Sequence, residues 1–229
     1  MIYDINGNPI AGDDHWSGKS WYAYGTSLTS TEQGKYVPYV AQFSGLVATN
    51  KGVPGGALVA NRDIYNRLMD NTDGKTDADL ITIEVGANDA ASTLGTPLDL
   101  ANTTFCGALN VCLKNILLNC KAQVVLMDST RSRYAVGGSL SDPYPLDQVA
   151  SGGYTFLERS EAIRKVAEAN GIYYIPFGSG LGLGLYREQS GNLYNADQIH
   201  HTNLGGYNLA AGIWSYLKNI PLWYTALPT

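Results

Sequence analysis

Short runs of β-favouring apolar residues alternate with longer amphipathic segments along nearly the whole chain. Gly, Asn or Asp bounds the runs, and their near-continuous apolarity is typical of parallel strands that are buried on both faces. We expect five such strands, at residues 21–24, 46–49, 80–85, 123–128 and 172–175. Few folds satisfy this alternation, because strand–helix–strand units wind with a single hand into a layered α/β structure.

The segments between the runs have the periodicity of helices with one apolar face. Phe156, Ile163 and Val166 share such a face, charged residues lie largely on the opposite one, and Asn170-Gly171 supplies a stop. We expect helices at residues 57–69, 100–120, 154–169 and 204–217, and a less regular one at residues 34–44. The predicted fold is therefore a three-layer α/β/α sandwich around a five-stranded parallel sheet.

Two regions do not follow the alternation. Residues 1–19 contain the turn sequence Asn6-Gly7-Asn8-Pro9 and are predicted to form an N-terminal arm or hairpin. Residues 20–229 are predicted to form one domain, which suits a chain of 229 residues. Within that domain, residues 129–153 are rich in Gly, Ser, Pro, Tyr and Asp and too long for an ordinary connection, so we expect them at the rim of a substrate pocket.

Composition argues against several classes of protein. Lys and Arg total 15 against 20 Asp and Glu, and no segment gathers basic residues into a run, so nucleic acid is not an expected partner. No stretch approaches the roughly 20 apolar residues of a membrane span, and the start MIYDINGNPI lacks the features of a signal peptide. A soluble protein is expected. Its compartment stays open, because a secretion signal removed before this start would leave the same chain, and its oligomeric state is not predicted.

The cysteines and the first histidine do not indicate a metal site. Cys106, Cys112 and Cys120 are odd in number and lack CxxC spacing, and they recur with leucines at helical spacing, as small apolar residues on a buried helix face do. His15 has no partner at the spacing of helical metal ligands. We expect neither a metal nor a cofactor.

Four polar segments follow expected strands or precede the last expected helix. They are residues 24–30, 50–56, 84–89 and 197–207. Ligands of open α/β sheets bind at the carboxyl ends of the strands, which places all four segments near one site. Ser27 on a tight turn would expose its hydroxyl there, Asn88 could donate a hydrogen bond, and Asp197 could fold back onto the ring of His200. Taken singly, each segment is more typical of an ordinary turn or loop.

Taken together and in this order, the four segments resemble the sequence blocks of the GDSL or SGNH hydrolases. These blocks are a Ser in Gly-Asp-Ser-Leu, a Gly, a Gly-x-Asn-Asp segment and an Asp-x-x-His segment, and the resemblance covers residues 20 to about 217. It implies a flavodoxin-like sheet of order 2-1-3-4-5. It further implies that Ser27 is the nucleophile, His200 the general base and Asp197 its orienting partner. The amides of Ser27 and Gly55 and the side chain of Asn88 would form the oxyanion hole.

The resemblance implies a serine esterase that hydrolyses carboxylic esters through an acyl-enzyme. An acidic, aromatic-rich chain with a Tyr- and Ser-bearing loop suits a polar ester, so we expect short acyl esters, such as acetyl esters, of carbohydrates. The partner would be a small-molecule or oligosaccharide ester. Other acyl hydrolases share the fold, which does not by itself choose among substrates.

Two positions depart from the family pattern or leave a choice. Thr26 stands where the first block has Asp, so the hydrogen bonds of that Asp must be made differently. His201 is an alternative base, but Gln198 would then replace the carboxylate, and a neutral Gln could not stabilise an imidazolium. We therefore prefer His200. Thr26 and His201 are expected to belong to the pocket, with His201 at its mouth.

The competing class is a non-catalytic carbohydrate-binding or phage-structural module on the same scaffold. The 16 Tyr and four Trp residues could stack on sugars, although aromatic residues more often pack in cores. Such a module has no physical need for Ser27, Asn88, Asp197 and His200 together. A dinucleotide-binding protein is not expected, because no GxGxxG opens the first helix, and the glycine-rich residues 178–184 lack the Lys of a phosphate loop.

Overall fold

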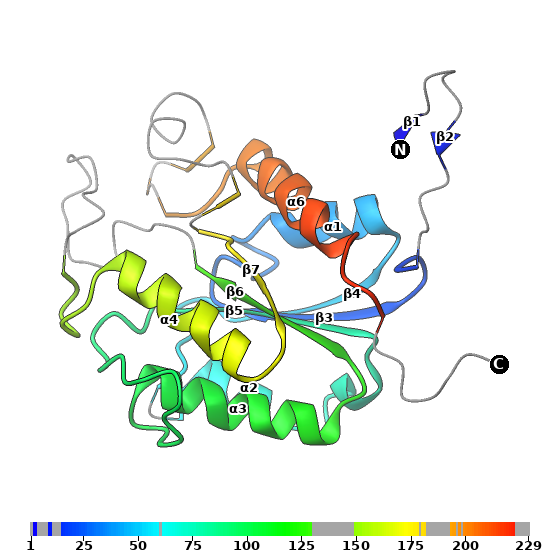
Figure 1. The fold of residues 1–229 in the computed structure, drawn as a ribbon. Coiled ribbons are helices and arrows are strands. Elements are labelled where there is room, and N and C mark those ends of the chain that lie inside the picture. The colour runs from blue at the N-terminus through cyan, green and yellow to red at the C-terminus, as the bar shows by residue number, and fades with distance from the viewer. Residues whose placement is uncertain are drawn as a thin grey trace.

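The central sheet of the computed structural model is parallel throughout (Figure 1). The structure describes residues 2–3, 9–10, 15–59, 61–129, 149–178, 180–181, 193–195, 197 and 199–222. The strands are β3 (Ser20–Gly25), β4 (Val47–Gly52), β5 (Leu80–Val85), β6 (Gln123–Asp128) and β7 (Tyr173–Ile175). Their order, β4-β3-β5-β6-β7, is 2-1-3-4-5 in chain order and confirms the predicted topology.

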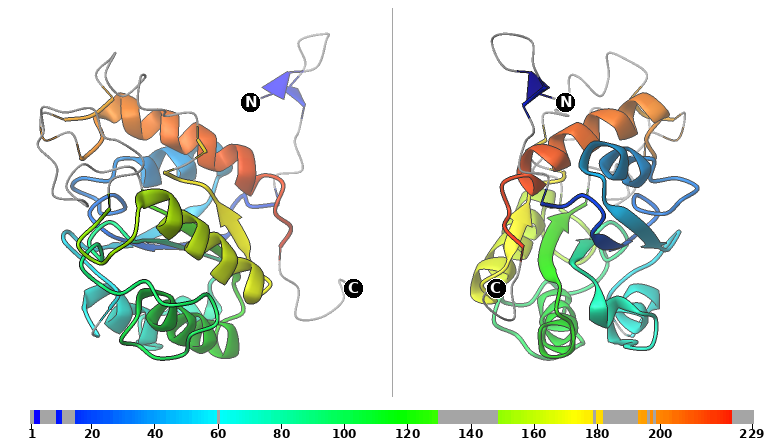
Figure 2. Two further views of the ribbon diagram at one scale, coloured as in Figure 1. Left: turned by 60° about the vertical axis from the view of Figure 1, so that its left-hand side comes forward. Right: turned by 90° about the vertical axis from the view of Figure 1, so that its right-hand side faces the viewer.

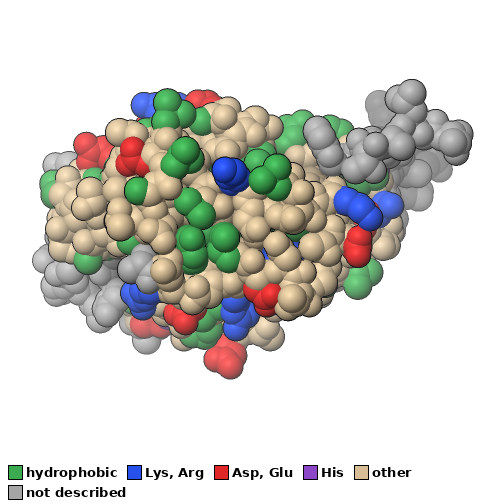
Figure 3. Space-filling view, turned by 90° about the horizontal axis from the view of Figure 1, so that it is seen from below, with side chains coloured by type: hydrophobic (Ala, Val, Ile, Leu, Met, Phe, Trp, Pro, Cys, Tyr) green, Lys and Arg blue, Asp and Glu red, His purple; other side chains and the backbone are tan. Residues whose placement is uncertain are grey.

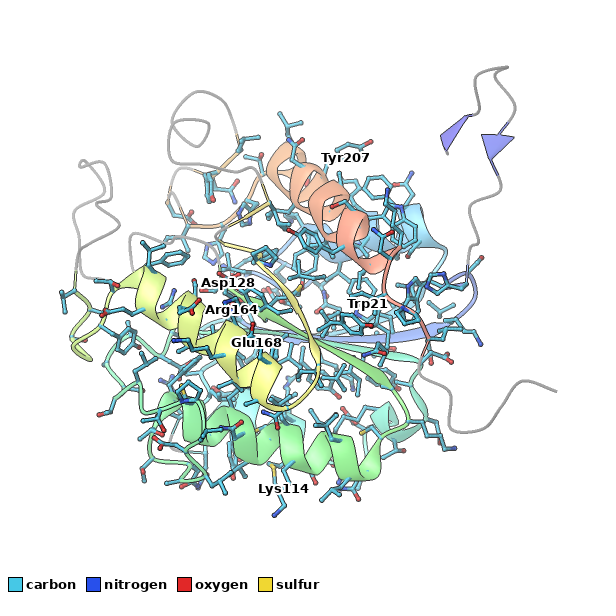
Figure 4. The ribbon with its side chains drawn as sticks, in the orientation of Figure 1. Trp21, Lys114, Asp128, Arg164, Glu168 and Tyr207 are labelled. Carbon is cyan, nitrogen blue, oxygen red and sulfur yellow. The ribbon has the colours of Figure 1, made fainter. Side chains whose placement is uncertain are left out.

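Helices cover both faces of this sheet (Figure 2). They are α1 (Tyr36–Ser44), α2 (Asp63–Met69), α3 (Phe105–Asn119), α4 (Phe156–Ala169) and α6 (Asn203–Leu217). The helices α1 and α6 pack on one face, where Trp21 lies between the sheet and α6 (Figure 4). The helices α2, α3 and α4 enclose a second core on the other face. The predicted three-layer sandwich is therefore confirmed.

Burial differs between the central and the edge strands. All six residues of β5 and of β6 are buried, as expected for strands with helices on both faces. The expectation fails for β4, where Val47 is 61% exposed and none of the six residues is buried. This strand lies at the edge of the sheet, where no further strand covers it.

Two helices, α2 and α3, begin later in the chain than predicted. Thr104 caps α3 by accepting a hydrogen bond from the amide of Gly107, so α3 does not begin at residue 100. Thr155 and Glu158 form a capping box at the start of α4. The prediction of a helix from residue 57 is wrong, because the amides of Leu58 and Val59 donate to the side chain of Asp89 instead.

The N-terminal segment is tied to the domain through its last residues. Strands β1 (Ile2–Tyr3) and β2 (Pro9–Ile10) pair antiparallel. Trp16 is fully buried, and its indole nitrogen donates a 2.9 Å hydrogen bond to the carbonyl oxygen of Leu217. Nε2 of His15 lies 2.8 Å from the carbonyl oxygen of Ile220. The chain thus enters the domain against the end of α6.

The buried cysteines are core residues of α3, as predicted. Cys106 and Cys112 are fully buried among apolar side chains, and Cys120 packs partly against them. Burial raises the pKa of Cys106 to about 11, and the negative charge of Asp99 acts in the same direction. The Cys106 thiol is therefore protonated at neutral pH.

Some predicted features lie outside the described residues. They are most of the segment 129–153, residues 6–8 of the predicted N-terminal turn, and most of the glycine-rich segment 178–184.

Among the helices that the structure describes, none combines the length and apolar character needed to cross a bilayer. On the face shown in Figure 3, Lys and Arg side chains are interspersed with Asp and Glu rather than gathered in a stripe.

Candidate active site

Ser27 stands on a tight turn directly after β3. The amides of Thr29 and Ser30 both donate to the carbonyl oxygen of Thr26 at 3.1 Å, which closes the turn around Ser27. The turn presses against the end of its own strand, since a Cβ atom on Gly25 would lie 2.1 Å from Oγ1 of Thr29. Glycine at residue 25 therefore allows the turn to present the hydroxyl at the carboxyl edge of the sheet.

His200 reaches Ser27 from the loop before α6. Its Nε2 lies 2.9 Å from Oγ of Ser27, and its Nδ1 lies 2.8 Å from Oδ2 of Asp197. The other carboxylate oxygen of Asp197 accepts hydrogen bonds from the amides of Ile199 and His200 at 2.9 and 3.0 Å. A carboxylate, an imidazole and a hydroxyl thus form one hydrogen-bonded chain.

The backbone around His200 is fixed on both sides. The amide of Asn195 donates to the carbonyl oxygen of His200 at 2.8 Å, and the amide of Thr202 donates to that of Leu193 at 3.0 Å. Thr202 then caps α6 by accepting from the amide of Gly205. The imidazole therefore projects from a loop that is tied to its neighbour and ends in a capped helix.

Asp197 is held in its charged form. Partial burial acts to raise its pKa, but the hydrogen bonds from the His200 ring and from the amides of His200 and Ile199 outweigh that effect, so the pKa is lowered. An ionised Asp197 favours the tautomer that carries a proton on Nδ1 of His200. Nε2 is then the acceptor that faces the hydroxyl of Ser27.

A pocket of about 290 Å³ opens beside Ser27 and His200. Its lining residues are Ser27, Leu28, Gln33, Pro54, Gly55, Ala87, Asn88, Ile199 and His200. The structure thus brings Ser27, Gly55, Asn88 and His200 together, as predicted from their separate segments. Leu28 falls at the Leu of the first sequence block, but sequence analysis gave it no role, and Gln33 and Ile199 match no defined residue of any block.

Three hydrogen-bond donors border this pocket. Asn88 uses one amide proton to bind the carbonyl oxygen of Gly56 at 2.9 Å, which leaves its second proton free to donate elsewhere. In the described part of the chain, the amides of Ser27 and Gly55 donate to no other group. Gly55 has a φ of 69°, and no heavy atom lies within 4 Å of the place a Cβ would take. The arrangement is suited to binding a negatively charged oxygen.

Asp89 joins two of the three loops that carry these donors, those after β4 and β5. It is buried, and its Oδ1 accepts from the amides of Leu58 and Val59 at 2.9 and 3.1 Å. Its carbonyl oxygen accepts a 2.7 Å hydrogen bond from the hydroxyl of Tyr154. The loops after β4 and β5 are therefore connected by a side chain within the Gly-Ala-Asn-Asp segment, for which sequence analysis proposed no role.

One protein family matches most of the chain. A model of the GDSL-like lipase/acylhydrolase family matches residues 12–208. The chain belongs to this family. A search of curated protein sequences found no match.

Solved structures of the same fold align with nearly the whole chain. A protein from Lactobacillus plantarum is 21% identical with a TM-score of 0.71, covering 88% of this chain and 97% of its own. A possible lipase from Chitinophaga pinensis is 17% identical with a TM-score of 0.61, covering 87% and 98%. A catalytic mutant of an acetylxylan esterase from Geobacillus stearothermophilus is 16% identical with a TM-score of 0.61, covering 92% and 98%. At these identities the likeness concerns the fold.

Thr26, which replaces the Asp of the first block of this family, does not line the pocket. It is fully buried, and both its amide and its hydroxyl donate to Oε2 of Glu84, at 2.8 and 2.7 Å. The expectation that Thr26 belongs to the pocket is therefore wrong. Its side chain turns inward, toward a buried carboxylate that sequence analysis did not connect with it.

His201 is also buried rather than placed at the pocket mouth. Its ring packs edge-on against Phe177 and lies 4.7 Å, centroid to centroid, from the ring of Tyr194. Neither ring nitrogen has a hydrogen-bond partner among the described residues. Burial lowers the pKa of His201 to about 3, with the nearby His200 acting in the same direction, so this ring is neutral. The side chain next to His200 thus belongs to the core.

Other polar groups do not gather as metal ligands would. In the ranges that the structure describes, no three His, Cys, Asp or Glu side chains are placed to hold a metal ion.

Asp128, at the carboxyl end of β6, accepts a 2.9 Å hydrogen bond from the amide of Gly178 (Figure 4). This carboxylate fixes the loop after β7.

Proposed function

We propose that the chain is a serine esterase that hydrolyses carboxylic esters through an acyl-enzyme. The observation that carries this proposal is the hydrogen-bonded chain from Asp197 through His200 to Ser27, which ends beside the pocket. Ser27 is the nucleophile, His200 is the general base, and Asp197 orients and stabilises the imidazolium. A binding module of the same fold has no use for a histidine aligned in this way.

The reaction begins with the attack of Ser27 on the ester carbonyl. His200 takes the hydroxyl proton as the bond to carbon forms, and the carbonyl oxygen becomes an oxyanion. When the intermediate collapses, His200 gives this proton to the departing alcohol. Water, activated by His200, then attacks the acyl-enzyme, and the acid leaves as Ser27 recovers its proton.

The oxyanion hole would consist of the amides of Ser27 and Gly55 and the side chain of Asn88. All three residues line the pocket, and the hydrogen bond from Asn88 to Gly56 holds the side-chain donor in place. Donors that are fixed before the reaction stabilise the transition state without reorganisation. Removal of one such donor typically raises the barrier by about 2.7 to 4 kcal/mol.

Short acyl esters of carbohydrates are the substrates that we propose. Leu28, Pro54 and Ile199 offer apolar contacts for a small acyl group within a pocket of about 290 Å³. Gln33 supplies an amide that could bind a sugar hydroxyl at the same pocket. One structure of the same fold is named as an acetylxylan esterase, which fits an acetyl ester of this kind.

Hydrolysis assays with matched serine variants test this function. We expect wild-type protein to hydrolyse p-nitrophenyl acetate faster than the octanoate and to release acetate from acetylated xylo-oligosaccharides. Ser27→Ala should abolish both activities. Ser44→Ala is the control, since this buried serine lies at the end of α1 and donates to the carbonyl oxygen of Val40. A rate that rises steadily with acyl length would contradict the short-chain proposal, and a wild-type protein inactive on every ester would favour a binding module.

A further inference from the structure

A buried carboxylate lies directly beneath the turn that carries Ser27. Glu84, on β5, is fully buried, and its Oε2 accepts hydrogen bonds from the amide and hydroxyl of Thr26. The hydroxyl of Thr29 lies 3.3 Å from the same oxygen. A Cβ atom on Gly25 would lie 2.8 Å from it, so the carboxylate also packs closely against the end of β3.

These hydrogen bonds hold residues on both sides of Ser27 and involve none of the polar groups of Ser27 itself. Thr26 precedes Ser27, and the hydroxyl of Thr26 in turn accepts a 3.2 Å hydrogen bond from the amide of Leu28. Thr26 therefore contacts Glu84 directly, and Leu28 is connected to Glu84 through the hydroxyl of Thr26. The hydroxyl of Ser27 stays available to His200, and its amide donates to no other group among the described residues.

We propose that Glu84 is the positioning residue of the nucleophile turn, and that Thr26 and Glu84 form a matched pair. The inference rests on the proposed function, since it concerns the placement of Ser27 in ester hydrolysis. Thr26 occupies the position where the first block of the family has Asp. With threonine there, the carboxylate beneath the turn comes from β5, and an Asp at residue 26 would put two carboxyl groups into one buried space.

A buried arginine provides the charge that partly balances Glu84. Burial raises the pKa of Glu84 to about 7, while the hydrogen bonds from Thr26 and Thr29 and the positive charge of Arg159 oppose this rise. Arg159 is only 2% exposed and donates a 2.7 Å hydrogen bond to the carbonyl oxygen of Gly86. Arg159 therefore acts on the charge of Glu84 and also contacts the start of the loop that carries Asn88.

Two pairs of variants distinguish positioning from general stability. Glu84→Met removes the acceptor at similar volume, and Thr26→Val removes the hydroxyl. We expect each to lower kcat on the order of 10- to 100-fold with little change in KM, because the nucleophile is displaced while the pocket remains. Glu84→Gln and Thr26→Ser keep the acceptor and the donor, and should retain most of the wild-type kcat.

Labelling of Ser27 by a fluorophosphonate gives a second readout. This reagent reacts with the activated serine without a bound sugar, so its rate reports the serine, its base and the oxyanion hole independently of sugar binding. The labelling rates of Glu84→Met and Thr26→Val should fall in parallel with kcat. Thr26→Asp should also lower both rates, and adding Glu84→Gln to it should restore them in part, because one carboxyl group then remains beneath the turn.

Thr82→Val is the matched control for the loss of a buried hydrogen bond between the same strands. Thr82 lies on β5, and its hydroxyl oxygen accepts a 2.9 Å hydrogen bond from the indole nitrogen of Trp21 on β3. We expect this variant to lose stability and keep its kcat per folded molecule. If Glu84→Met and Thr26→Val likewise lose stability but keep kcat and labelling rate, the inference is wrong. If wild-type protein neither hydrolyses esters nor reacts with the fluorophosphonate, the proposed function fails instead.

Discussion

The side-chain amide of Asn88 donates a 2.9 Å hydrogen bond to the carbonyl oxygen of Gly56, 32 residues earlier in the chain. This contact fixes the orientation of the amide at the pocket, and with Asp89 it joins the loops after β4 and β5. Two of the three loops that carry the donors of the proposed oxyanion hole are therefore held together by direct contacts.

Asn88→Ala should lower kcat by about 10²- to 10³-fold with a much smaller effect on KM, because the lost hydrogen bond forms chiefly in the transition state. Steady-state kinetics on p-nitrophenyl acetate measures this effect. Asn208→Ala is a suitable control, since Asn208 donates to the carbonyl oxygen of Leu204 on the exposed face of α6. Equal kcat values for wild type and Asn88→Ala would show that Asn88 does not belong to the oxyanion hole.

Substitution of the two adjacent histidines should separate catalysis from packing. His200→Ala is expected to lower kcat by at least about 10³-fold while the protein stays folded, since the base is lost. His201→Ala should mainly reduce the free energy of unfolding, because its ring fills space beside Phe177 and Tyr194. The kcat of each variant, corrected for its folded fraction, distinguishes the two roles. A larger loss of kcat per folded molecule in His201→Ala than in His200→Ala would mean that His201 is the base.

The burial of His201 makes the fold sensitive to acid. Its pKa is about 3 in the folded state and near 6.5 in the unfolded chain, so between these values the unfolded chain binds more protons. The contribution of the neutral ring to stability is therefore complete above pH 6.5 and is lost as the pH falls toward 3, by at most about 1.4 kcal/mol per pH unit.

His201→Phe removes this titration and keeps an aromatic ring against Phe177. Urea unfolding at a series of pH values should show that the variant loses less stability than wild type on acidification from pH 6.5. His15, whose ring is only partly buried, offers the control substitution His15→Phe. Parallel stability curves for wild type and His201→Phe would mean that His201 does not titrate as its burial implies.

Two glycines, one at the end of β4 and one in the loop that follows it, should respond differently to alanine. A Cβ on Gly52 would lie 2.3 Å from the amide nitrogen of Ser30, so Gly52→Ala must displace the turn of Ser27 and should lower both stability and kcat. Gly55 has a φ of 69° and open space around it, so Gly55→Ala should lose only about 1 to 2 kcal/mol of stability from backbone strain. Thermal unfolding and kcat together test the pair, and a more severe loss of stability at Gly55 would contradict it.

The strands were the most predictable part of the fold. Each predicted strand overlaps an observed one. The central strands β5 and β6 are buried throughout and carry an apolar run that is visible locally. Helix starts were less predictable, as the segment 57–62 shows. Its apolar spacing suits a helix, yet Asp89, some thirty residues later, takes the amides of Leu58 and Val59.

The pairing of Asp197 with His200 and the grouping of Ser27, Gly55 and Asn88 were predicted from four separate segments. The strand-end rule placed the segments near one site, and the resemblance of all four segments to the sequence blocks of the family implied the role of each residue. No comparable signal marked the inward orientation of Thr26 or the burial of His201. Both are determined by which side chains surround them in the folded protein.

The sequence by itself determined the layered architecture, the strand order through family resemblance, and the residues that meet at the candidate site. These features depend on local periodicity and on short motifs, which are present in the chain before it folds. Only the tertiary structure decided that Glu84 lies beneath the turn of Ser27. Thr26 and Glu84 are 58 residues apart, and their hydrogen bonds form because β3 and β5 are neighbours in the sheet.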